Sequence, residues 1–273
     1  MSVHALAPVR TSLPHVMRSE RIKLLSLRST RWALLLSVLI TLTMSALMSV
    51  GLAFAPPEEG MDVDALILAT YGERPALGAM GQAFLTAQIL TAVLGTLIVS
   101  TDRSSGTLRT AVTAVPRRTL IVAAKLITSA TAAIAVAVVI GVATYAIATP
   151  AFAATADPAP FFIPETIATL LGGSFGIAVT ALLSSALAFF FRSTAAALGV
   201  VLVTLFILPS IIQLVPIVGS PIASLLPPSF INGLVVSALG SDWPRMAISF
   251  GGAAAWAAVA SLAANWRFRR TDI

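Results

Sequence analysis

The chain has 273 residues, of which 58% are apolar and only 10% are charged. Soluble domains carry about 25% charged residues, and a chain of this size cannot bury so much apolar surface in one core. The composition therefore excludes an ordinary soluble protein and indicates a protein that lies in lipid. Cysteine is absent, which excludes disulfides and thiolate metal sites.

The first 31 residues are basic and polar, and the apolar run after them is too long for a cleavable signal. On a helical wheel, an apolar arc of about 100° forms beside a group of arginines. The arc holds Leu13, Val16, Met17, Leu24 and Leu27, and the arginines are Arg10, Arg18, Arg21 and Arg28. We expect a basic amphipathic helix at the membrane surface. The helix serves either as a membrane anchor alone or also as a contact for a partner. In the second case Glu20, which lies inside the apolar arc, is the candidate acid for a salt bridge.

Six charge-poor stretches follow, and each is long enough to span a membrane. A helix needs about 20 apolar residues to cross about 30 Å of hydrocarbon, and backbone amides in lipid must bond within their own segment. We therefore expect an all-α integral membrane protein with one transmembrane domain at 32–266 and tails at 1–31 and 267–273. Its predicted spans are 32–54, 80–100, 121–147, 166–190, 195–217 and 246–266.

The basic residues predict the orientation, because they gather on the cytoplasmic side of a membrane protein. All Lys and Arg except Arg74 and Arg245 fall in the two tails, the 101–125 loop and the 191–194 turn. We expect these segments in the cytoplasm, with both termini inside. The net charge of +6 then reflects topology, and nucleic acid is not an expected partner.

The stretch 219–241 is uncharged and nearly long enough for a seventh span. Pro221, Pro227 and Pro228 interrupt it, and proline breaks helices. A seventh span would also place the basic C-terminal tail outside. We therefore expect two short re-entrant or interfacial helices, around 221–226 and 229–239, on the outer side.

The spans lack the residues of an enzyme or an ion-coupled pump. We expect no catalytic residue and no metal site, since both histidines, His4 and His15, lie in the N-terminal tail. The phosphate loop of an ATPase ends in Gly-Lys-Ser/Thr, and neither lysine of this chain follows a glycine. The amides of Gln88 and Gln213 either form interhelical hydrogen bonds or line a substrate path.

The loop between the second and third spans contains a short amphipathic helix. Leu108, Ala111, Val112 and Val115 fall on one face, at the spacing of a helix. Arg109, Thr110 and Thr113 take the polar side, Asp102 and two serines precede the helix, and Pro116 ends it. The apolar face either rests in the lipid headgroups or docks into a groove of a partner.

Two segments carry a resemblance to a known family. The run from Ser19 to Trp32, and the run from Thr101 to Arg109 with Val115-Pro-Arg-Arg and Lys125, resemble the permeases of ABC-2 type exporters from actinobacteria. The order of spans matches that family over the whole chain. One departure is Asp102-Arg103-Ser104, where the family usually has Glu-Tyr-Arg or a similar triplet.

The resemblance implies that two cytoplasmic segments dock onto a separate ATPase subunit. The interfacial helix would contribute Glu20, Arg21, Lys23, Leu24 and Arg28. The loop would contribute Asp102, Arg103, Gly106, Thr107, Leu108, Arg109, Ala111, Val112, Val115, Pro116, Arg117 and Arg118. Two ATPase copies, which bind ATP and Mg²⁺, would join this chain and a second permease that is identical or paralogous. This chain would bind no cofactor itself.

The expected function is that of a permease subunit in the plasma membrane of a bacterium. The separate ATPase would drive alternating access for an apolar or amphipathic substrate, such as a drug, a lipid or a peptide. One alternative is a non-transporting immunity or signalling subunit on the same scaffold. Another is an ion-coupled carrier or channel, which the absence of charges in the middle of the spans opposes.

Overall fold

The computed structural model describes residues 12–55, 62–115, 117–153 and 160–270. Every regular element in these ranges is a helix, and six helical segments are long and apolar enough to cross a membrane. They are α2 (Arg28–Ala53), α4 (Pro75–Ser104), α6 (Arg118–Ala151), α7 (Pro164–Ala188), the segment Thr194–Gln213, and α12 (Trp243–Arg269). The chain is an all-α, multi-pass membrane protein, as the sequence predicts.

Several spans extend beyond the predicted limits. The helix predicted at 80–100 is α4 and begins at Pro75, and the helix predicted at 121–147 is α6 and begins at Arg118. Pro75 suits the first turn of a helix, where its missing N–H is not needed. Asp102 and Arg103 at the end of α4, and Arg118 at the start of α6, were assigned to the loop. They are helical because other elements pack against them.

Three long helices, α4, α6 and α7, pack against one another to form the centre of the bundle. Their contacts are close because small residues face large ones. A Cβ atom added to Gly173 of α7 would lie 2.2 Å from the ring of Phe84 in α4, closer than any real contact. The ring itself is fully buried. Glycine at 173 is therefore required by the approach of α7 to α4.

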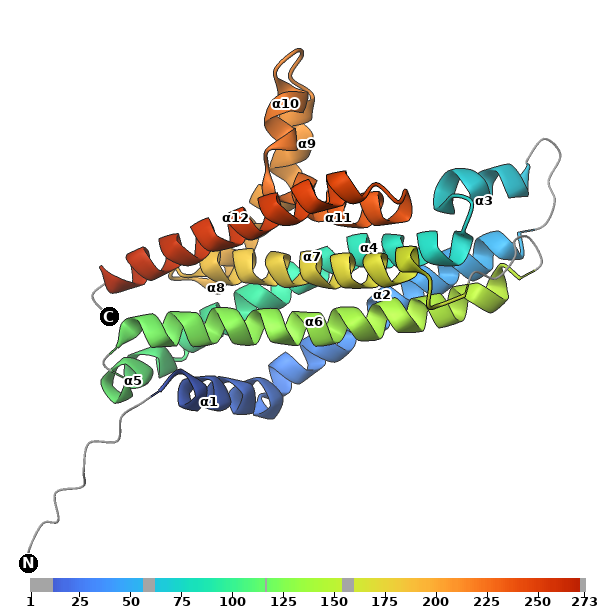
Figure 1. Ribbon diagram of the computed structural model, residues 1–273. Helices are drawn as coiled ribbons and strands as arrows, with labels where there is room; N and C mark the ends of the chain where they lie inside the picture. Colours follow the sequence, from blue (N-terminus) through green and yellow to red (C-terminus); the bar gives the residue numbers. More distant parts are fainter. Residues whose placement is uncertain (1–11, 56–61, 116, 154–159, 271–273) are drawn as a thin grey trace, which may run out of the picture.

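The fifth span, Thr194–Gln213, is irregular. It runs through α8 (Thr194–Leu202), a π-helical turn η1 (Val203–Ile207) and α9 (Leu208–Gln213). Pro209 has no N–H, and its ring conflicts with the carbonyl four residues earlier; π turns are a usual place for such a disturbance. The helix ends at Gln213 and not at the predicted residue 217. Figure 1 shows α9 and α10 (Gly219–Ser224) standing away from the bundle.

Two short helices lie between the fifth and sixth spans, close to the predicted limits. They are α10 (Gly219–Ser224) and α11 (Pro227–Leu239), and α11 packs against α7 and α12. A third short helix, α3 (Val63–Tyr71), was not predicted. The carboxylate of Asp62 caps it by accepting a hydrogen bond from the N–H of Ala65, at 3.1 Å.

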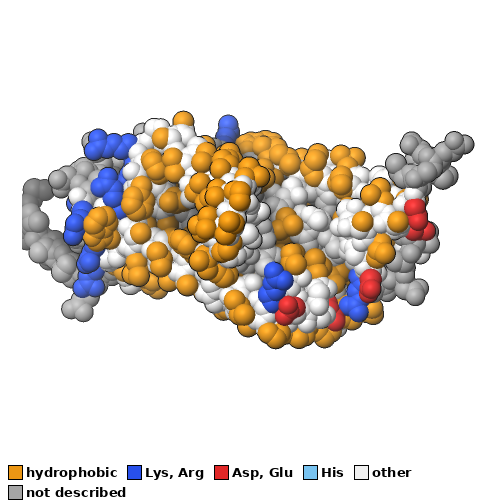
Figure 2. All heavy atoms as spheres, turned by 90° about the horizontal axis from the view of Figure 1, so that it is seen from above, with side chains coloured by type: hydrophobic (Ala, Val, Ile, Leu, Met, Phe, Trp, Pro, Cys, Tyr) orange, Lys and Arg blue, Asp and Glu red, His pale blue; other side chains and the backbone are white. Residues whose placement is uncertain are grey.

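The two ends of the bundle differ in charge. Figure 2 shows Lys and Arg side chains gathered at one end and Asp and Glu side chains toward the other. We call the first the basic end; it contains α1 (Leu13–Ser26), α5 (Thr107–Ala114) and the C-terminal ends of α7 and α12. The opposite, acidic end contains α3 and the starts of α4 and α12.

Candidate functional site at the basic end

A tight corner joins the second span to the short helix α5. Gly106 takes a left-handed conformation, with φ of 74°, which glycine adopts without steric cost. The hydroxyl of Thr107 then donates to both the backbone oxygen and Oδ1 of Asp102, at 3.1 Å each. The predicted helix over 108–115 is therefore present as α5, and its start is bonded to the end of α4.

The apolar face of α5 points into the chain and not away from it. Leu108 is only 2% exposed and belongs to a core cluster with Val99, Ile121, Phe189 and Phe268. The other residues of this face, Ala111, Val112 and Val115, pack against the same cluster. Leu108 therefore faces its own bundle and not a groove of a partner, whereas Ala111, Val112 and Val115 are half-buried.

The opposite face of α5 is hydrophilic and open. Thr107, Thr110 and Thr113 are exposed, and so is Arg117 just after the helix. Arg109 lies within α5, and Pro116 falls outside the described residues. A partner that approaches α5 therefore meets hydroxyl groups, with arginine beside them.

Four charged residues near the start of α5 form a closed cluster of ion pairs. We call this cluster the ionic ring. Its members are Glu20 and Lys23 of α1, Asp102 of α4 and Lys125 of α6. Glu20 accepts from the ammonium groups of Lys125 and of Lys23, at 2.9 Å each. Asp102 contacts Lys23 at 3.3 Å and Lys125 as well. Each carboxylate thus meets both ammonium groups, and the ring has no net charge.

The ring is buried, which the sequence did not reveal. The side chain of Lys125 is 0% exposed, and those of Glu20 and Asp102 are 6% and 9% exposed. Lys125 was counted with the 101–125 loop and also falls in the predicted span 121–147, and it lies inside α6. Glu20 was a candidate acid for a partner, whereas it is paired within the chain. Buried charges of this kind need partners, because an unpaired one is very unfavourable.

Lys23 is the most accessible member of the ring, with 35% of its side chain exposed. Burial lowers the pKa of Lys23, but the hydrogen bond and charge of Glu20 and the charge of Asp102 outweigh it. The pKa therefore lies above its ordinary value of 10.5. Lys23 is positively charged at neutral pH, and the ring stays balanced.

Two arginines bind the carbonyl groups at the ends of neighbouring helices. Arg103 donates to the backbone oxygens of Phe189 and Phe191, just after α7, at 3.1 and 2.5 Å. Arg118 reaches the backbone oxygens of Phe268 and Arg269 in α12, at 3.4 Å each. A cation at the C-terminal end of a helix satisfies free carbonyls and is favoured by the helix dipole. These bonds tie the end of α4 to the end of α7, and the start of α6 to the end of α12.

The amphipathic helix α1 is present and packs against α6 and α2. Val16 and Leu24 of its apolar arc are buried, while Arg21 and Arg28 are exposed. Among the described residues of the basic end, the exposed charged side chains are all positive, because the two acids are inside the ring.

The two glutamines proposed for a substrate path do not meet. Gln88 is 5% exposed and donates to Oδ1 of Asn232 in α11, at 2.9 Å. Gln213 ends α9, is exposed, and belongs to the part of the chain that stands away from the bundle. The bond from Gln88 to Asn232 is an interhelical hydrogen bond, which was one of the two interpretations.

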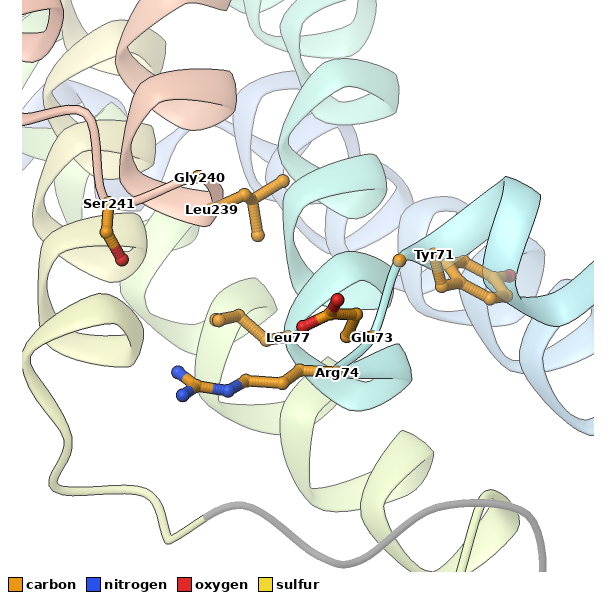
Figure 3. A pocket seen from close by; sticks show the side chains of 8 residues that line it. Tyr71, Glu73, Arg74, Leu77, Leu239, Gly240 and Ser241 are labelled. Atoms are coloured by element: carbon orange, nitrogen blue, oxygen red, sulfur yellow. The ribbon is translucent and has the colours of Figure 1, made fainter.

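The acidic end holds a contrasting, open site. Arg74 lies 3.3 Å from Glu165, and the hydroxyl of Ser241 lies 3.3 Å from the other oxygen of the same carboxylate. A cavity of about 370 Å³ lies beside them, lined by Tyr71, Gly72, Glu73, Arg74, Leu77, Leu239, Gly240 and Ser241. In Figure 3, Arg74 and Glu73 extend along the same side of this cavity.

Two features of the sequence indicate the ionic ring. Glu20 stands in the apolar arc of an amphipathic helix, and Lys125 stands among apolar residues at helical spacing. An ionisable residue on an apolar face needs a buried partner of opposite charge. Within the described ranges, no group of acids or histidines is arranged to hold a metal ion.

Comparisons with known proteins leave the family open. No model of a known protein family matches the chain. No curated protein sequence matches it either.

Proposed function

We propose that the chain is the membrane-spanning permease subunit of an ATP-driven exporter whose ATPase is a separate polypeptide. The observation that carries the proposal is the construction of α5. It is a short helix between two spans, its apolar face is anchored in the bundle, and its hydroxyl face is open. A helix built in this way transmits force, because a push on its surface moves the spans to which it is fixed.

The topology in this proposal follows from the charge at the two ends. The basic end faces the cytoplasm, since Lys and Arg gather there in membrane proteins. Both termini are then inside, α1 lies along the inner surface, and α10 and α11 form a re-entrant or interfacial pair on the outer side. The host membrane is the plasma membrane of a bacterium.

The partner surface is polar and acidic in this proposal. The exposed part of α5 offers hydroxyl groups, and the exposed charges around it are positive. ATP and Mg²⁺ bind to two copies of the ATPase, and a second permease completes the assembly. When the ATPase subunits close, they move α5. Asp102 and Arg103 then carry the motion to α1, α6 and α7, which they contact.

The substrate is apolar or amphipathic in this proposal. No described ionisable residue lies in the middle of a span; Asp102, Arg103 and Lys125 lie within two turns of the basic end. An ion-coupled carrier needs such residues as relays deep in the membrane. An external ATPase that acts mechanically does not need them.

The test is co-purification with the ATPase in mild detergent, with variants of the open face of α5. Thr110→Glu with Thr113→Glu places negative charge toward an acidic partner, and we expect the ATPase to be lost while the melting temperature stays unchanged. The matched control is Ser220→Glu, an exposed hydroxyl of α10 outside the basic end. Leu108→Asp, in contrast, should unfold the corner, because Leu108 is buried.

The captured protein must hydrolyse ATP and contain a phosphate loop. Stimulation of its ATPase activity by a transported compound in vesicles separates an exporter from an immunity or signalling subunit. If the double variant retains the ATPase at the yield of the parent, α5 is not the docking site.

A further inference from the structure

A second cavity, of about 250 Å³, lies between α2, α3 and α4, in the half of the bundle toward the acidic end. Its lining residues are all uncharged: Met44, Ser45, Met48, Thr70, Tyr71, Gln82, Ala83 and Thr86. α3 covers it from the acidic end, and Figure 1 shows α3 beside the start of α4. Since a water molecule occupies about 30 Å³, the cavity has room for a small polar group and a few methylenes.

The cavity lies within the outer part of the hydrocarbon layer. At 1.5 Å per residue, Gln82 is about 10 Å and Thr86 about 17 Å from the start of α4 at Pro75. The span Pro75–Arg103 has 29 residues and is about 43 Å long by the same rise. Centred in a 30 Å layer, the span therefore extends about 7 Å beyond each side. Gln82 then lies a few ångströms, and Thr86 about 10 Å, inside the edge of the hydrocarbon layer.

The amide of Gln82 is the unusual feature of this cavity. Its side chain is exposed, and among the described residues no hydrogen bond reaches its amide group. The hydroxyl of Thr86, one turn later, donates to the backbone oxygen of Gln82, at 3.1 Å. An amide that meets hydrocarbon without a partner is costly. Gln88 shows the contrast, because Asn232 satisfies it.

We propose that this cavity binds the neutral, hydrogen-bonding head of an amphiphile, such as a long-chain alcohol or ester. The glutamine amide supplies both a donor and an acceptor, and no charged side chain is present to pair with a charged head. Met44 and Met48 are flexible and adapt to varied chains. Both are exposed toward lipid, at 47% and 59%, so the apolar chain of the ligand continues along α2 into the bilayer.

The ligand class named here is also the substrate class of the proposed exporter. Binding to the cavity is independent of the proposed function, and only the transport of the ligand rests on it. A resident membrane lipid and a transported amphiphile share the chemistry described. Binding itself is measured on this chain alone, without any ATPase. A negative result here leaves the co-purification test of α5 unaffected, and the reverse is also true.

The experiment uses the absence of cysteine from the chain. A single reporter, Met48→Cys, is reconstituted in phosphatidylcholine vesicles, and its labelling by an uncharged maleimide is timed. Dodecanol, dodecane and dodecyltrimethylammonium are added in turn. We expect dodecanol to slow labelling by at least about threefold, as two-thirds occupancy requires, and the other two compounds to have little effect.

Variants test the role of the amide. Gln82→Leu should remove the protection by dodecanol, and Ser45→Phe, which fills the cavity from α2, should remove it as well. Gln213→Leu is the matched control, because it removes an exposed glutamine outside the cavity, and it should keep the protection. If labelling of the purified chain accelerates after delipidation, a membrane lipid is the resident ligand. If delipidation has no effect, the site is open to a transported compound.

Three results would overturn the inference. Equal slowing by dodecane and dodecanol would mean partition into an apolar surface without recognition of the head. Retained protection in both Gln82→Leu and Ser45→Phe would place the ligand elsewhere. Disulfide-linked dimers through the reporter would mean that a second copy of the chain covers the cavity.

Discussion

The helix α4 carries an ion-paired cluster at each end, and the two clusters differ sharply. At its start, Arg74 pairs with Glu165 of α7 at 3.3 Å, with 49% of the arginine side chain exposed. At its end, Asp102 belongs to the ionic ring, in which Lys125 is 0% exposed. Both clusters join segments far apart in the sequence. Only the ring does so with three of its four side chains buried.

The comparison shows that burial, and not the number of contacts, decides how much stability is lost when one partner of an ion pair is removed. An exposed pair is screened by water and salt, and it contributes little to stability. A buried pair loses the hydration of both partners, so it adds little net stability when complete. Removal of one partner is nevertheless costly, because the other charge is left alone. We infer that the ring fixes the position of α1, since it pairs two charges of α1 with one of α4 and one of α6.

The largest effect is expected for Lys125→Met. The change leaves two buried carboxylates with only Lys23, and removal of one partner from a buried pair costs about 3–5 kcal/mol. We expect α1 to detach from the bundle. The measurement is maleimide labelling of Leu24→Cys, a reporter at a buried position of α1, which should accelerate by more than about tenfold.

The control for this prediction restores the charge balance. Glu20→Gln combined with Lys125→Met leaves one carboxylate, Asp102, with one ammonium, Lys23. The double variant should label more slowly than Lys125→Met alone, since balanced removal of a buried pair is much less costly. Equal or faster labelling in the double variant would show that Lys125 acts through packing and not through charge.

A smaller effect is expected for Lys23→Met, because water reaches this side chain. It removes the same charge from the ring as Lys125→Met, but solvent at the open side partly compensates the loss. Labelling of Leu24→Cys should rise less than in Lys125→Met. The comparison between the two lysines isolates burial, since the partners are the same two acids.

The pKa of Lys23 also gives the pH dependence of this contribution. Its pKa in the folded chain lies above the ordinary value of 10.5. The stabilisation is therefore complete below the pKa of the unfolded chain and is lost as the pH rises through the folded pKa. Labelling of the parent reporter, corrected for the ionisation of the thiol, should be constant around neutral pH and accelerate only in strongly alkaline solution.

The sequence predicts most helices of this molecule and their approximate limits. The six spans, the helices α1 and α5, and the pair α10 and α11 follow from apolar runs, helical periodicity and prolines. These signals are local, because a membrane forces each span to satisfy its own backbone. The missed helix α3 is short, and its start carries two acids, Asp62 at the N-cap and Asp64 in the first turn, so it resembled an exposed loop.

The contacts between elements could not be read in the same way. The face of α5 that contains Leu108 looked free, because an apolar ridge on a short loop helix has no partner in the sequence itself. The ring needs Glu20 to meet Lys125 across 105 residues of the chain, and Lys23 to meet Asp102 across 79 residues. Periodicity shows which face of a helix is apolar, but it does not show which neighbour covers that face.

The smallest effect is expected for Arg74→Gln at the acidic end. The side chain is about half exposed, and its partner Glu165 also interacts with Ser241, so the carboxylate keeps a hydrogen bond when the arginine is removed. The melting temperature should stay within the error of the measurement, and high salt should reduce any difference further. Arg245→Gln, at an exposed arginine of the same end, is the matched control. A loss of stability comparable to that of Lys125→Met would mean that water does not screen this pair, and that burial is not what separates the two ends of α4.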